Sequence, residues 1–196
     1  MPIATLTKVT TPTAQQICAL ATTAGFKITA PEQASPTEYL NGLLGEKKLE
    51  AAVQFLAFAL PAREAVWWVC VCARAQLAET TPQPVLQAIE AAETWVRKPT
   101  EEHRRAAMAC AQATDFQSPA AWAAVAAFWS GGSMSPPNLP EVPAPPHLLG
   151  SAVAGAVTLA AVQLEPGMAE QKRERFVAAA VEIANGGTGR LAVQGA

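Results

Sequence analysis

The chain has 196 residues, a length that suits one domain, and 51% of them are hydrophobic against only 15% charged. Its formal net charge of −2 argues against nucleic acid or an anionic membrane as the main partner. Alanine is the commonest apolar residue; it is the strongest helix former and also lets helices approach closely. The composition therefore predicts an all-α protein with closely packed helices.

Hydrophobic spacing and capping residues predict helices along most of the chain. Ser35, followed by Pro36 and by Glu38 three residues on, forms a capping box that marks a helix start. Over 62–79, apolar residues lie on nearly every side of the predicted helix, which indicates a central, buried helix. The predicted helices span 13–24, 35–44, 46–60, 62–79, 84–98, 100–115, 118–131, 147–163 and 168–184.

The short connections between these helices imply antiparallel neighbours, in a compact multi-helix bundle or a short α-solenoid of helical hairpins. We expect an N-terminal arm and short helix over 1–34 and a helical domain over 35–185. Residues 186–196, which begin with a glycine-rich run, are predicted to be a helix cap and flexible tail. On the last helix, Lys172 and Arg173 are expected to face outward.

The segment 148–164 carries no charge, but it is rich in small residues and shorter than the roughly 20 apolar residues of a spanning helix. We expect a buried core helix there and no membrane insertion. Gly150, Ser151, Ala154 and Gly155 suit a helix that crosses another closely.

The cysteines predict neither a disulfide framework nor a metal site. Cys70 and Cys72 point to opposite sides of a helix, and neither histidine is near a cysteine in sequence. The four cysteines, which include Cys18 and Cys110, are interpreted as buried free thiols in a reducing compartment. With no secretory signal visible at the N-terminus, a cytoplasmic protein without cofactors is expected.

A proline-rich segment over 131–146 has prolines at every third position (137, 140, 143 and 146), which is the period of polyproline II. Leu139 and Val142 fall on a second apolar line, and mostly polar residues form the third. We predict an extended strap, about 30 Å long at roughly 3.1 Å per residue, with its polar line outward. It either links two parts of one core or offers a surface to a partner.

Catalytic residues are scarce, and we expect no enzymatic activity. No zinc-protease, nucleophile-elbow or phosphate-loop motif is present. The acid–base candidates are few: Asp115, Tyr39, His103 and His147. Arg104 and Arg105 lie next to Glu101 and Glu102 and are interpreted as part of a solvated, charged helix face.

One stripe of the central helix stays open to a functional interpretation. Arg63, Trp67, Cys70 and Arg74 fall within about 40° of one another at 100° per residue. The two guanidinium groups beside the indole could bind a carboxylate or a partner's peptide. The alternative is that they pair with glutamates of neighbouring helices at the edge of the bundle.

The run from Phe128 through Ser133, the spaced prolines up to Leu148 and the alanine-rich stretch 152–157 resemble a known family, and residues 61–68 fit it as well. It is an uncharacterised bacterial family of small helical proteins often encoded within type VI secretion gene clusters. The resemblance covers about 35–185. It implies an accessory role, as an adaptor or chaperone, and brings no catalytic residues with it.

Three hypotheses therefore remain. The first is an adaptor or chaperone that docks a secreted effector or a spike component, with partner-binding residues Arg63, Trp67, Arg74, Leu139 and Val142. The second is a small-ligand-binding protein or enzyme with a pocket near Arg63, Trp67 and Arg74. The third is an immunity protein. The sequence predicts no oligomeric state.

Overall fold

The computed structural model describes residues 3–191, and within them the predicted all-α fold is confirmed. The helices, in chain order, are α1 (Ala14–Thr23), α2 (Pro36–Gly45), α3 (Leu49–Ala59), α4 (Ala62–Arg74), α5 (Gln83–Arg97), α6 (Glu101–Gln112), α7 (Pro119–Trp129), α8 (Leu148–Val162) and α9 (Ala169–Ala184). A short 3-10 turn, Pro166–Met168, precedes α9, and the described residues contain one isolated β-bridge but no β-strand.

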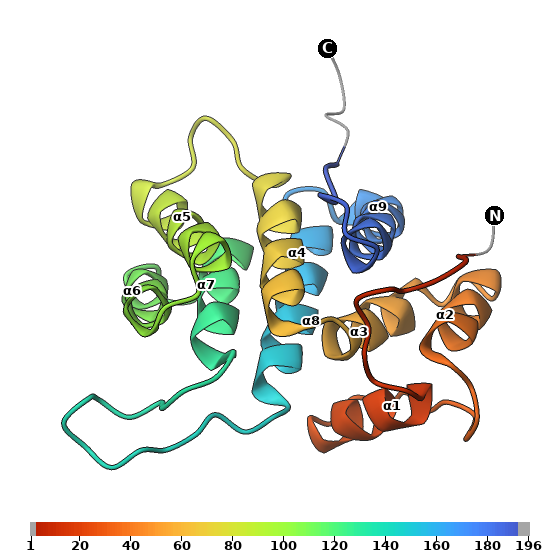
Figure 1. The fold of residues 1–196 in the computed structure, drawn as a ribbon. Helices are drawn as coiled ribbons and strands as arrows, with labels where there is room; N and C mark the ends of the chain where they lie inside the picture. The colour runs from red at the N-terminus through yellow and green to blue at the C-terminus, as the bar shows by residue number, and fades with distance from the viewer. Residues whose placement is uncertain (1–2, 192–196) are drawn as a thin grey trace.

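Helix α4 stands at the centre of the molecule, as its apolar circumference predicts. It packs against α5, α7, α8 and α9, and Figure 1 shows helices on both sides of it. Trp68 on α4 is fully buried, and its indole Nε1 donates a hydrogen bond of 2.8 Å to the backbone oxygen of Phe176 on α9. Helices α3 and α9, distant in sequence, also pack together. Because a solenoid joins only consecutive repeats, this arrangement is a bundle.

The helix starts follow the expected capping chemistry. At α2, Ser35 Oγ accepts a hydrogen bond from the Glu38 amide, while the Glu38 carboxylate accepts one from the Ser35 amide. These hydrogen bonds lower the pKa of the Glu38 carboxyl. Thr13, Thr100 and Ser118 cap α1, α6 and α7 in the same way with their hydroxyl oxygens.

The uncharged helix α8 packs inside the protein, against α3, α4, α7 and α9. Gly150 faces α3 so closely that a Cβ atom added there would overlap the ring of Phe58. Ala154 is also buried, whereas Gly155 lies on the exposed side of the helix. Of the small residues that suggested a close crossing, Gly150 and Ala154 thus face the interior.

Among the described residues, no single helix has both the length and the apolarity to cross a membrane. Helix α8 meets those criteria only when it is joined to residues 166–184, and the two are bent by 114° at their junction.

The N-terminal segment forms hydrogen bonds both with α2, early in the chain, and with the end of α9, the last helix described. The backbone of Ile3 makes two hydrogen bonds with the amide side chain of Asn41 on α2. Further along, the Lys8 amide donates to the Ala184 oxygen at the end of α9, at 2.8 Å. Leu6 between them is buried in the common core. The described part of the arm therefore packs along the helical domain.

Helix α4 ends at Arg74, five residues earlier than the apolar pattern indicates. Beyond it the backbone amides of Gln76 and Leu77 bond three residues back, to Ala73 and Arg74. The side chain of Gln76 then accepts a hydrogen bond from Lys172 of α9. Just after the end of α4, the chain thus makes a contact with the distant helix α9 that no local sequence pattern indicates.

The close approach of α8 to α3 predicts opposite effects for two alanine substitutions. Gly150→Ala should lower the free energy of unfolding by about 1–3 kcal/mol, because the new methyl group must displace the Phe58 ring. Gly155→Ala, whose Cβ meets nothing within 4 Å, should be neutral or raise it by up to about 1 kcal/mol through helix propensity. Urea unfolding of both variants measures this, and a shift of both in one direction would contradict the packing.

Burial predicts which thiols react. Cys18, Cys70 and Cys72 are buried, and burial raises the pKa of each of these thiols, whereas Cys110 is half-exposed. Native protein should therefore react with an aromatic disulfide reagent at one thiol quickly and at all four only when unfolded. In Cys110→Ser the fast phase should disappear. A fast phase that persists in this variant would show that a buried thiol becomes accessible in the native state.

Candidate functional site

The proline-rich residues 131–146, here called the proline loop, connect α7 to α8 and project from the body of the protein (Figure 1). The loop folds back on itself. The Met134 amide donates to the Val142 oxygen at 2.7 Å, and Ser133 forms an antiparallel bridge with Pro143. The Ser133 hydroxyl oxygen also accepts a hydrogen bond from the Val142 amide, at 3.1 Å. These bonds keep the two arms of the loop together.

This geometry differs from the extended strap that the proline spacing predicts. The Leu139 amide bonds to the Pro136 oxygen at 3.0 Å, so that the chain reverses at Pro137 and Asn138, residue types common at the centre of β-turns. As a result the line expected to pack inward is exposed: Leu139 is 54% and Val142 47% accessible. The prediction of an extended strap with its polar line outward was wrong, because a proline period carries no information about such a turn.

Arg104 of α6 anchors the base of the proline loop. Its guanidinium donates through Nε and Nη2 to the two carboxylate oxygens of Glu101, at 2.6 and 2.8 Å. The same group donates to the backbone oxygens of Phe128 and Ser133, and it lies 4.4 Å above the centroid of the Phe128 ring. Arg104, Glu101, Phe128 and Ser133 are called the Arg104 cluster below. It fixes where the loop leaves α7.

The charges of this cluster are strongly coupled. Arg104 is only 4% exposed, which corrects its assignment to a solvated face, and its guanidinium hydrogen bonds lower the pKa of the Glu101 carboxyl to about 2. Arg105 adds a second ion pair to Glu101 at 2.6 Å. A buried arginine is stable when its donors are satisfied, and Arg104 meets this requirement with a carboxylate and two carbonyl groups.

Arg63, Trp67 and Arg74, the stripe of α4 that the sequence singled out, each contact a different part of the protein. Arg63 Nε donates to the Val96 oxygen near the end of α5, at 2.7 Å. Trp67 is half-buried, and its Nε1 donates to the Thr188 oxygen at 2.8 Å. Arg74 makes a two-pronged ion pair with Glu93 of α5, both distances being 2.8 Å. The structure therefore brings Trp67 and Arg74 to one pocket, described below, and leaves Arg63 outside its lining.

The glycine-rich residues after α9 cap this helix, as predicted. Gly186 has a positive φ of 86°, and the Gly186 and Gly187 amides bond back to the Ile183 and Glu182 oxygens. The described part of the predicted tail, 186–191, contacts α9 and Trp67. Residues 192–196 of that tail lie outside the described part of the chain.

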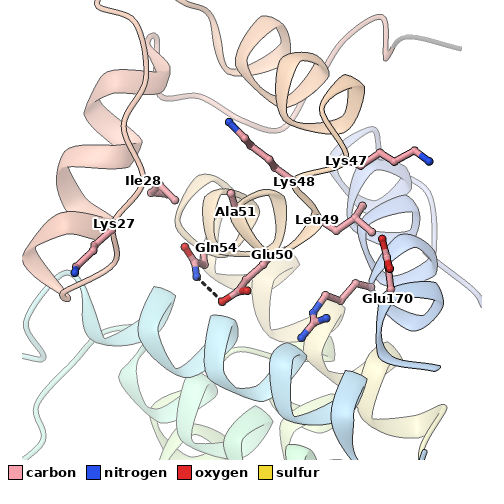
Figure 2. A pocket seen from close by; sticks show the side chains of 10 residues that line it. Lys27, Ile28, Lys47, Lys48, Leu49, Glu50, Ala51, Gln54 and Glu170 are labelled. Carbon is pink, nitrogen blue, oxygen red and sulfur yellow. Dashed lines mark hydrogen bonds between the residues drawn. The ribbon is translucent and has the colours of Figure 1, made fainter. Parts of the chain in front are cut away.

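A second pocket, of about 390 Å³, opens at the start of α3. Its lining includes Lys27, Lys47, Lys48 and the acids Glu50 and Glu170. Figure 2 shows the three lysine side chains extending in different directions, so that their ammonium groups do not meet at one point. This pocket has the charge for an anion but not the converging donors of a binding site.

Comparison with known proteins places the chain in a family. A family model described as "Family of unknown function (DUF6931)" matches residues 39–184. The chain belongs to this family. The DUF6931 match runs from within α2 to the end of α9, so it includes the Arg104 cluster and the proline loop. No curated protein and no solved structure shows a significant match to the chain.

The lowered pKa of Glu101 predicts a pH-dependent contribution to stability. The carboxyl titrates near 4.5 when unfolded and near 2 when folded, so its stabilisation is complete above about pH 4.5 and is lost as the pH falls towards 2. Because Glu101 is largely exposed, we expect Glu101→Gln to cost about 1–2 kcal/mol at pH 7. Urea unfolding at pH 7, 5 and 3 should show this difference shrinking at the lowest pH.

The matched control is Glu102→Gln in the same helical turn, which should change the free energy of unfolding by less than about 0.5 kcal/mol. If the effect of Glu101→Gln does not depend on pH, or if Glu102→Gln has the same effect, the ion pair does not stabilise the loop base as described.

Proposed function

We propose that the protein is a non-catalytic accessory protein that binds another protein through its proline loop. The observation that carries this proposal is the pair of exposed apolar side chains, Leu139 and Val142, on a loop anchored by the buried Arg104. A docking segment that is ordered before binding loses less conformational entropy in the complex. Prolines restrict the same segment further.

The role and the partner class of the proposal come from the sequence resemblance. The family that the chain resembles is often encoded in type VI secretion gene clusters, and this resemblance suggests an adaptor or chaperone for a secreted effector or a spike component. Buried free cysteines suit the reducing cytoplasm, where such an adaptor would meet its cargo. An immunity protein would use the same kind of surface, but its partner would be a toxin.

The test is an affinity purification of the full chain from its native host, followed by binding measurements with each recovered protein. Replacing both Leu139 and Val142 with serine should lower the affinity for a specific partner at least about tenfold, because buried apolar anchors dominate such interfaces. The matched control is Met168→Ser, which changes another exposed apolar side chain, far from the loop in sequence.

A partner that binds the double variant and the parent chain equally, or that Met168→Ser weakens as much, would contradict docking through the proline loop. Recovery of a type VI effector or spike component supports the adaptor role. Recovery of a toxin whose activity the chain blocks supports the immunity role instead.

A further inference from the structure

A pocket of about 580 Å³ lies between α4, α9, the α8–α9 connection and the end of the described chain, and it is lined by Trp67 and Arg74. Its volume falls within the roughly 300–1,000 Å³ typical of small-ligand sites. The residues of the proline loop take no part in its lining. Any ligand bound here would therefore act independently of the proposed docking loop.

Much of the pocket wall is apolar and comes from separate segments of the chain. Its apolar lining residues are Trp67, Val71, Leu77, Leu164, Phe176 and Leu191. Leu164 is 68% exposed at the edge of the pocket and has a positive φ of 65°, which is uncommon for a residue other than glycine. The chain thus presents a large apolar side chain to solvent, beside a concave apolar wall that an apolar ligand would cover.

The polar group that distinguishes this pocket is the ammonium of Lys172. The sequence pattern places Lys172 outward, but the residue is buried, and its Nζ donates to Gln76 Oε1 and to the Gln163 backbone oxygen, each at 2.9 Å. Both acceptors are uncharged. Its nearest carboxylate, that of Glu165, lies 3.9 Å away on a side chain that is mostly exposed. A buried cation with so little compensating charge favours an anion beside it.

The charges around Lys172 also favour an anionic ligand. Four cationic and two anionic side chains line the pocket, in a chain whose net charge is −2. Of the two carboxylates, that of Glu93 is engaged at both oxygens by Arg74. Arg74 is thereby also occupied and is partly exposed, whereas Lys172 is buried and its carboxylate neighbour is exposed and 3.9 Å away. A phosphate group, with more charge, would need several converging donors.

We propose that this pocket binds a small apolar monocarboxylate, such as a medium-chain fatty acid. The carboxylate accepts a hydrogen bond from the Lys172 ammonium, and it takes the place of the distant Glu165 as counter-charge. The acyl chain lies against Trp67, Val71 and Phe176, under Leu164. This arrangement neutralises the buried cation and covers the exposed apolar edge at the same time.

Calorimetric titration of the full chain with decanoate, hexanoate and decanol tests both halves of the proposal. Decanoate should bind once per chain and at least about tenfold more tightly than decanol, because the neutral alcohol oxygen carries no charge to pair with the Lys172 ammonium. It should also bind more tightly than hexanoate, by up to about fourfold for each added methylene group. Equal affinity for decanoate and decanol, or no binding of decanoate, would overturn the proposal.

Two variants locate the site. Lys172→Gln should lower the affinity for decanoate at least about tenfold and leave the affinity for decanol unchanged. A general loss of structure would lower both. Val71→Trp, which fills the pocket and keeps Lys172, should abolish binding of both. The matched control is Arg173→Gln, since Arg173 is adjacent in sequence but lines the pocket at the start of α3; it should bind like the parent chain.

If Arg173→Gln weakens decanoate as much as Lys172→Gln does, the ligand responds to general positive charge and the proposed site is wrong. Thermal unfolding of each variant checks that it folds. The double serine variant of the proline loop should bind decanoate normally, so the failure of one proposal is distinguishable from the failure of the other.

Discussion

The fold depends on how closely the neighbours of α4 approach it. Helices approach a central helix most closely where the side chains at the contacts are small. Most of the buried positions of α7 and α8 are accordingly alanine. With so much alanine inside, the few large buried side chains fill the space between helices. Trp68 is the clearest example, because it fills the space beside α4 and also bonds to the backbone of α9.

The helices themselves were predictable from sequence because their causes are local. Caps such as Ser35 with Glu38, and apolar spacing along each helix, depend on residues a few positions apart. The buried α8 followed from its lack of charge and its small residues. The end of α4 was predicted too late, because the residues after Arg74 are still apolar enough for a helix. There a contact with Lys172 of α9 competes with the local preference.

The candidate sites were harder to predict, since they depend on where individual polar side chains are buried. Arg104 and Lys172 were both expected on solvated faces, yet both are buried. A signal was present in each case: Arg104 shares its helix face with Ala107 and Ala111, and Lys172 shares one with Phe176. In both predictions the charge of the side chain outweighed this periodicity. Some of the partners that make burial possible are remote, among them the Ser133 and Gln163 oxygens, and no spacing indicates them.

The hydrogen bonds of residues 3–8 with Asn41 of α2 and with the end of α9 have a consequence for how the chain acquires its structure. Their partners are separated by up to nearly the whole chain, and α3 likewise waits for α8 and α9 to cover it. Contacts of such long range form late, because the loop they close has a high entropic cost. During synthesis the part of α3 that packs against α9 therefore stays uncovered until α9 has left the ribosome. Closure of the core therefore waits for the synthesis of α9.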